Sequence, residues 1–182
     1  MLDDAFGQYL VPDPGERLVV QRGLYADTIE RAIGEGRVDA WGDPIVGVAI
    51  WLRRPALVEA DPTGALPAPA RRPPVWVPPE AAARAQVFGA VLRELRELAR
   101  PDRHAYLDSI GVLPDHRRRG IASRLLDAGH AWADAAGLPC ALDALTDENV
   151  AFYERRGYRI VATAPVPGSD LRITAMRRQP AP

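Results

Sequence analysis

A basic turn between two predicted elements carries the clearest chemistry in the chain. An apolar run that ends at Val112 is followed by three arginines at positions 117–119, then by Gly120 and the small residues Ala122 and Ser123. This order predicts a strand, a turn and the start of a helix, where backbone N–H groups and the positive end of the peptide dipole are exposed. Glycine has no Cβ to keep a ligand away from the backbone. The pattern therefore predicts a seat for a phosphate or pyrophosphate.

Two common phosphate-binding loops are not present at this turn. The GxxxxGK[ST] loop needs a lysine, and the chain has none; the GxGxxG loop needs three glycines, and the turn holds only Gly120. Taken alone, the turn is equally compatible with a solvated basic surface before an ordinary helix.

A second polar segment carries groups that could move a proton. Asn149 and Tyr153 stand four residues apart on a predicted helix, so their side chains share one face. A phenol has a reference pKa of about 10, so it stays protonated at neutral pH and can donate a proton to a leaving group. From the residues alone, the simpler alternative is that Tyr153 only packs beside Phe152.

The strand that leads into the basic turn changes its pattern midway. In a regular strand Leu107 points to one face, whereas Ile110 and Val112 point to the other. A switch near Asp108 and Ser109 predicts a β-bulge, which leaves backbone groups unpaired by the sheet. The alternative is an ordinary central strand with one polar interruption.

Together these segments resemble the GCN5-related N-acetyltransferases, the GNAT superfamily. Arg117-x-x-Gly120-x-Ala122 matches the acyl-CoA-binding signature Q/R-x-x-G-x-G/A, and residues 149–158 resemble a second segment of the family. The resemblance is close over about residues 103–178 and looser over about 37–60. Within the superfamily, the motifs are most similar to those of the puromycin N-acetyltransferase group.

The resemblance implies an α/β (α+β) fold, the GNAT acyl-CoA N-acyltransferase fold. Its central sheet is mixed and mostly antiparallel, with flanking helices and a splayed pair of parallel strands, here 105–112 and 141–145. Acetyl-CoA is the implied co-substrate, with its pantetheine arm between these strands. The residues expected to bind it are Ile110, Gly111, Val112, Arg117, Arg118, Arg119, Gly120, Ile121, Ala122, Ser123, Asn149 and Tyr153.

Direct acetylation of an amine needs a base for the amine, a donor for the developing oxyanion and a proton for the thiolate. We expect a backbone N–H near Ile110 to stabilise the oxyanion, and the resemblance assigns the proton donor to Tyr153. The candidate bases lie on the two splayed strands: Asp108 and Asp143 first, then His104 and Tyr106. Each of these is alternatively a structural residue.

Composition limits the classes of partner. The 182 residues, 47% of them hydrophobic, fit one domain with a substantial core, and the net charge of −1 gives no drive toward nucleic acid or an anionic membrane. The acidic start and the lack of an apolar run of about 20 residues predict a cytoplasmic protein. Cys140 lies in an apolar run and is expected to be a buried, inert thiol, and His116 and His130 are expected to have no catalytic role. Three scattered histidines predict no metal site.

The elements that position these groups follow from periodicity and breakers. We expect helices over about 2–10, 16–33, 80–100, 120–136 and 147–156, and strands over about 38–41, 45–52, 105–112, 140–145, 158–162 and 171–176. A turn is predicted at 12–15, Gly34 and Gly36 should end the second helix, and the Pro-rich residues 61–79 are predicted to form a surface loop. The strand that normally precedes the first helix of the family is expected to be missing.

These expectations describe an acetyl-CoA-dependent N-acetyltransferase that acts on a primary amine of a small molecule. The acceptor cleft would form from the N-terminal helices, the Pro-rich loop and the C-terminal strands. Trp41, Trp51 and Trp76 are candidates to line it, although core packing is favoured for the first two. The alternatives are a non-catalytic acyl-CoA-binding domain and an acetyltransferase of proteins or aminoacyl-tRNA. A homodimer is compatible with the sequence.

Overall fold

The computed structural model describes residues 4–54, 77–99 and 103–181. Over these residues the chain forms a six-stranded sheet in the order β1-β2-β3-β4-β6-β5. All neighbouring strands are antiparallel except β3 and β4, which are parallel. The predicted fold class, a mixed and mostly antiparallel sheet with flanking helices, is therefore confirmed.

The helices and strands follow one another in the expected order. The strands are β1 (Gly36–Trp41), β2 (Gly47–Arg54), β3 (His104–Val112), β4 (Cys140–Ala144), β5 (Arg159–Pro165) and β6 (Arg172–Arg178). The helices are α1 (Ala5–Leu10), α2 (Pro14–Glu35), α3 (Pro79–Ala99), α4 (Ile121–Ala135) and α5 (Asp147–Glu154), and a short 3₁₀ turn, η2, covers Pro114–His116.

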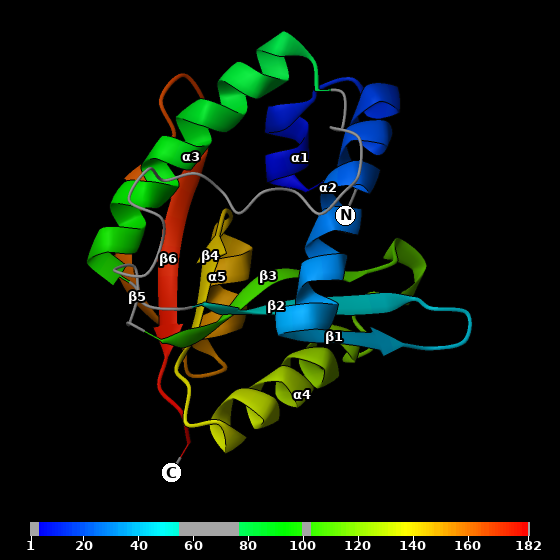
Figure 1. Ribbon diagram of the computed structural model, residues 1–182, viewed down its shortest axis with the longest axis vertical. Coiled ribbons are helices and arrows are strands. Elements are labelled where there is room, and N and C mark those ends of the chain that lie inside the picture. The colour runs from blue at the N-terminus through cyan, green and yellow to red at the C-terminus, as the bar shows by residue number, and fades with distance from the viewer. Residues whose placement is uncertain (1–3, 55–76, 100–102, 182) are drawn as a thin grey trace.

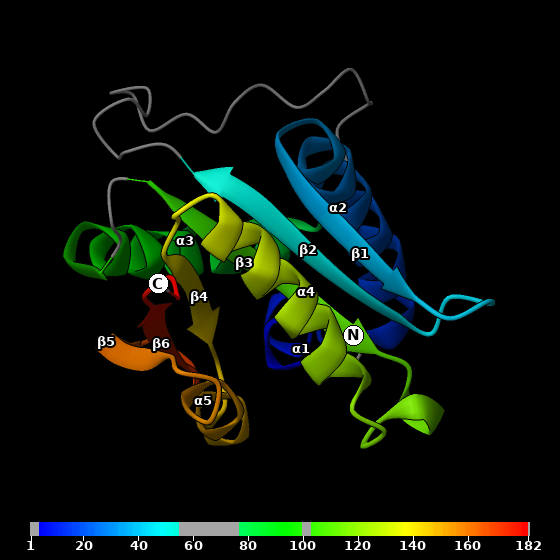
Figure 2. The ribbon, with the colours of Figure 1, turned by 90° about the horizontal axis from the view of Figure 1, so that it is seen from below.

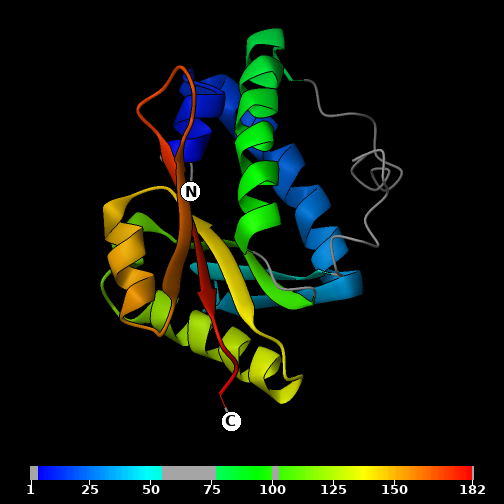
Figure 3. The same ribbon diagram turned by 90° about the vertical axis from the view of Figure 1, so that its left-hand side faces the viewer.

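The helices cover both faces of the sheet (Figures 1 and 2). α4 packs below β1, β2 and β3, and its residues share a buried cluster with Trp51, Leu107 and Leu142. α2 packs on the opposite face of β1 and β2. α3 lies along β5 and β6, as Figure 3 shows, and α1 sits between α2 and α3. The N-terminal helices therefore meet over the middle of the sheet, above the junction of β3 and β4.

The start of α2 differs from the prediction of a turn over 12–15. Asp13 caps the helix by accepting a hydrogen bond from the backbone N–H of Glu16 at 2.9 Å, and Pro14 occupies the first helical turn. Proline suits that position because its missing N–H would have no helical partner there. Gly34 stays helical, and Gly36 is the C-cap.

The predicted β-bulge is confirmed by the pairing of β2 with β3. Ile50 pairs with Ser109 and Trp51 pairs with Leu107, so Asp108 is the extra residue. Leu107 belongs to the cluster under α4, and Ile110 and Val112 pack against the same cluster. The bulge thus returns the apolar residues to one face after the polar interruption.

The strands β3 and β4 pair only over a short stretch. Their register joins Ala105 to Cys140 and Tyr106 to Ala141, and no further pair is formed over the described residues. From Leu107 onward, the edge of β3 that faces β4 has no partner strand within the part of the chain that the structure describes. The splayed pair of parallel strands is therefore present where the sequence predicted it.

Two of the three tryptophans that were candidates to line the acceptor cleft lie within the described residues. Trp51 is fully buried, and its indole packs so closely on Gly129 that a Cβ on that residue would overlap Nε1. The prediction that Trp41 packs in the core is wrong, because it ends the edge strand β1 and keeps 38% of its surface exposed. Trp76 and residues 61–76 of the Pro-rich loop lie outside the described residues, and Pro79 begins α3 and is not part of that loop.

Candidate active site

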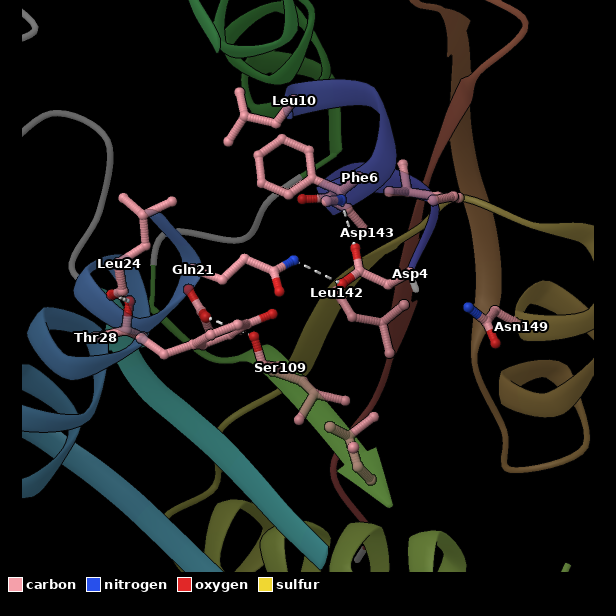
Figure 4. Close-up of a pocket in the computed structure, with 18 of the residues that line it drawn as sticks. Asp4, Phe6, Leu10, Gln21, Leu24, Thr28, Ser109, Leu142, Asp143 and Asn149 are labelled. Carbon is pink, nitrogen blue, oxygen red and sulfur yellow. Dashed lines mark hydrogen bonds between the residues drawn. The ribbon is translucent and has the colours of Figure 1, made fainter. Parts of the chain in front are cut away.

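A cavity of about 830 Å³ opens where β3 and β4 diverge. Its walls come from α1, α2, α3, β3, β4 and the start of α5. Figure 4 shows Gln21 and Asp4 pointing toward each other on one side, with Asn149 facing them from α5. The polar and ionisable lining residues include Asp4, Gln21, Tyr25, Arg96, Tyr106, Asp108, Arg117, Asp143, Glu148, Asn149 and Tyr153.

The basic turn beside this cavity ends in an uncapped helix. Gly120 is the N-cap of α4 with a φ of 78°, and no side chain caps it. The N–H of Arg124 donates to the Gly120 carbonyl at 3.1 Å, so the N–H groups of the three residues between them have no acceptor within the helix. A Cβ built on Gly120 would meet no atom of the described residues within 4 Å, so these residues leave the space in front of the turn open. This is the geometry that an anion seat requires.

The three arginines of the turn are exposed, and they face different spaces. Arg117 lines the main cavity and donates from Nε to the Val112 carbonyl at 3.2 Å. Arg118 has a φ of 59°, which together with Gly120 curls the turn. Arg119 lines a second hollow of about 690 Å³, together with Trp41, His116 and Arg124. The Arg124 guanidinium lies 5.4 Å from the centroid of the Trp41 ring.

Two residues of the predicted anion seat, Ile121 and Ser123, can offer a ligand their backbone N–H groups but not their side chains. The side chain of Ile121 is buried in the core under the sheet, so only its backbone faces the turn. The Ser123 hydroxyl already accepts a hydrogen bond from Arg156 at 2.5 Å. The backbone N–H groups, and not these side chains, are therefore the groups available to a ligand here.

The predicted pairing of Asn149 and Tyr153 on one helix face is observed. Thr146 is the N-cap of α5, and its hydroxyl accepts from the backbone N–H of Asn149 at 3.2 Å. Both Asn149 and Tyr153 line the cavity. Tyr153 also packs on the rings of Phe152 and Tyr158, at 5.2 and 5.6 Å. Burial raises the pKa of Tyr153 to about 12, so its hydroxyl stays protonated at neutral pH.

The two candidate carboxylates line the cavity from facing strands. Asp143 on β4 accepts a hydrogen bond from the Tyr106 hydroxyl of β3 at 2.9 Å. Asp108, the bulged residue of β3, accepts from the Ser109 hydroxyl at 3.0 Å. The structure therefore brings Asp108, Asp143 and Tyr153 to one space.

The histidines and the cysteine lie away from this space. His104 is buried at the start of β3 and is not among the lining residues that the structure describes. His130 is buried, with Nε2 3.0 Å from the Tyr158 hydroxyl, and burial lowers its pKa to about 4. Burial raises the pKa of Cys140 to about 11, as expected for an inert thiol. The described residues hold no group of three or more potential metal ligands.

Sequence reasoning missed part of the lining. Tyr25 on α2 faces Ser109, Asp108 and Asp4. The pKa of Tyr25 is raised to about 12, and burial is the largest cause. Phe6 on α1 and Phe88 on α3 stack with ring centroids 4.6 Å apart. The apolar residues at helical spacing in the predicted helix over 16–33 include Tyr25, but that spacing gives no sign that the apolar stripe closes over a cavity.

Comparison with known protein families assigns the chain to a family. Residues 49–158, more than half of the chain, match the family described as Acetyltransferase (GNAT) family. The chain therefore belongs to this acetyltransferase family, whose members use acetyl-CoA. The resemblance to the puromycin group within the family stays a prediction.

Solved structures share the fold at low identity. A protein described as histone acetyltransferase HPA2 and related acetyltransferase, from Corynebacterium glutamicum, is 24% identical, with a TM-score of 0.59 over 95% of this chain and 81% of that one. An insect protein assigned as arylalkylamine N-acetyltransferase 7, from the yellow fever mosquito, is 16% identical, with a TM-score of 0.63 over 95% and 74%. Naa20 of Chaetomium thermophilum, in complex with a bisubstrate analogue, is 19% identical, with a TM-score of 0.53 over 87% and 72%.

Proposed function

We propose that this protein transfers the acetyl group of acetyl-CoA directly to a primary amine of a small molecule. The observation that carries the proposal is one continuous cavity. It joins Tyr153 and Asn149 on one side to Asp108 and Asp143 on the other, and it extends beneath α1, α2 and α3.

The residues beside the cavity are suited to bind acetyl-CoA, the acetyl donor. The N–H groups of Ile121, Ala122 and Ser123 would hold the pyrophosphate, and the exposed arginines would add charge. The unpaired edge of β3 offers backbone groups of Ile110, Gly111 and Val112 to the amides of the pantetheine arm. When bound, acetyl-CoA supplies an acetyl thioester at the end of that arm.

The chain's own residues would move the protons. Asp108 or Asp143 would take a proton from the ammonium form of the acceptor, because both carboxylates line the cavity. The backbone N–H near Ile110 would stabilise the oxyanion that develops during transfer. Tyr153 would donate its proton to the sulfur as the C–S bond of the thioester breaks, and the second proton that the acetylated nitrogen loses would return through solvent to restore the phenol. Its pKa of about 12 keeps that phenol protonated at neutral pH.

The lining supports a cationic acceptor with an apolar body. Four carboxylates face the cavity, those of Asp4, Asp108, Asp143 and Glu148, against three guanidinium groups, those of Arg17, Arg96 and Arg117. Arg17 and Arg117 also donate to backbone carbonyls. Its apolar walls are formed by Phe6, Leu10, Leu24, Phe88, Leu92, Leu142 and Leu145. The cavity of about 830 Å³ has to hold the end of the pantetheine arm as well as the acceptor, which supports a small acceptor.

A turnover assay tests the proposal. Release of CoA from acetyl-CoA is measured with small amines, with puromycin included because of the sequence resemblance, and with peptides and aminoacyl-tRNA in parallel. We expect turnover with a small amine. Turnover only with peptides or tRNA would overturn the acceptor class, whereas CoA binding without any turnover would favour the non-catalytic alternative. Absence of CoA binding in calorimetry would overturn the whole proposal.

A further inference from the structure

Arg156 makes a set of contacts that neither motif explains. It follows Arg155, the C-cap of α5. One guanidinium nitrogen, Nη2, donates to the Ser123 hydroxyl at 2.5 Å, and Nη1 donates to the Phe152 carbonyl at 2.8 Å. The guanidinium also lies 3.7 Å from the centroid of the Phe152 ring. The Arg156 side chain is half-buried and contacts the Ser123 hydroxyl, the Phe152 carbonyl and the Phe152 ring.

These contacts join the two halves of the donor site. Ser123 lies in the first turn of α4, whose N–H groups form the anion seat, and Phe152 directly precedes Tyr153 on α5. Among the side-chain hydrogen bonds of the described residues, the one between Arg156 and Ser123 connects α4 to α5. Arg156 therefore contacts both the helix that carries the anion seat and the helix that carries the proton donor.

We propose that Arg156 is a positioning residue that holds α5 against the first turn of α4, so that Tyr153 meets the thioester when the pyrophosphate is seated. The inference rests on the proposed acetyl-CoA-dependent function. Arginine suits this role because its planar fork donates in two directions while its face stacks on a ring. Lysine has neither the fork nor the flat face.

Two other roles for Arg156 make different predictions. If its charge contacts the phosphates directly, the Ser123 hydroxyl is irrelevant. If it only stabilises α5, every acetyl donor is affected equally. A set of four variants separates the three roles: Arg156→Met, Ser123→Ala, the double variant, and Arg155→Met as a matched loss of an adjacent exposed arginine. Ser123→Ala keeps the backbone N–H of the seat.

The test measures the Kd of CoA by calorimetry, and kcat/KM with acetyl-CoA and with S-acetylpantetheine, which lacks the pyrophosphate. We expect Arg156→Met and Ser123→Ala each to weaken CoA binding and kcat/KM about five- to twentyfold, with no further loss in the double variant. With S-acetylpantetheine the loss should be at least about fivefold smaller, since that donor does not reach α4. Arg155→Met should stay within about twofold of the wild type in both measurements.

Other results overturn the proposal. A loss in Arg156→Met without a loss in Ser123→Ala assigns Arg156 to direct phosphate contact. An equal loss with both donors assigns it to the stability of α5, which the thermal unfolding midpoint of each variant checks. Failure of the wild type to bind CoA removes the proposed function instead, so the two ideas fail separately.

Discussion

The Tyr106 hydroxyl donates a 2.9 Å hydrogen bond to Asp143 across the junction at which β3 and β4 part. Tyr106 pairs with Ala141 at the end of the parallel ladder. Asp143 lies two residues beyond Ala141 on β4. A side-chain bond thus bridges the strands just beyond the point where backbone bonds stop. It holds the Asp143 carboxylate at the wall of the cavity.

We expect Asp143→Asn to lower kcat/KM about a hundredfold near neutral pH, because an amide cannot accept the acceptor's proton. Tyr106→Phe should cost about tenfold by releasing the carboxylate from its position. The double variant should be no worse than Asp143→Asn alone, as steady-state kinetics will show.

Asp108→Asn is the matched comparison for Asp143→Asn. If only that variant loses activity, Asp108 is the base and the Tyr106 bond is structural. If both single variants keep full activity, neither carboxylate is the base, and a chain of water molecules carries the proton.

Tyr153→Phe should lower kcat about a hundredfold and leave the Kd of CoA unchanged, because it removes the proton donor but keeps the ring in place. Tyr158→Phe is the control. It removes another buried hydroxyl, the one bonded to His130, outside the lining of the cavity. We expect that variant to lose stability and not kcat. Full turnover by Tyr153→Phe would remove the assigned donor.

Gly120→Ala should weaken CoA binding about tenfold, because φ near 78° is strained for alanine and the seat would change its shape. Gly137→Ala is the matched control for Gly120→Ala. Gly137 has a φ of 63° and open space around it, but it follows the other end of α4. Both variants should lose about 1 kcal/mol of unfolding free energy. Equal CoA affinities in calorimetry would contradict an anion seat at Gly120.

The free energy of unfolding should decrease as the pH falls from 6.5 toward 4, because the His130 imidazole is buried. Burial lowers its pKa to about 4 in the folded state, against an ordinary value of 6.5, so the unfolded state binds more protons between these values. The stabilisation is complete above pH 6.5 and is lost as the pH falls toward 4. We expect a loss of about 2–3 kcal/mol, measured by urea unfolding. His130→Gln should show a flatter profile over the same range, and an identical profile would assign the loss to other groups.

Several expectations from the sequence are not tested by the structure or the comparisons. The single-domain organisation, the missing first strand, the cytoplasmic location, the homodimer and the lack of nucleic-acid or membrane partners stay predictions. Within residues 4–54, 77–99 and 103–181, no helix combines the length and the apolar character that a membrane span needs.

The sequence by itself determined the features that depend on near neighbours in the chain. The start of α4 at Gly120 and the shared face of Asn149 and Tyr153 follow from helix geometry. The bulge at Asp108 follows from the change of apolar parity between Leu107 and Ile110. Each is set within about ten residues, so composition and spacing were sufficient.

Only the tertiary structure decided which distant groups meet. The Tyr106–Asp143 bond and the Arg156–Ser123 link depend on how strands and helices pack, and periodicity does not encode that packing. The same holds for Tyr25, an apolar-stripe residue that closes the cavity, and for Trp41, which an edge strand leaves exposed. A local pattern specifies the face that a residue takes on its own element, but the neighbour on that face is chosen by the packing of the whole chain.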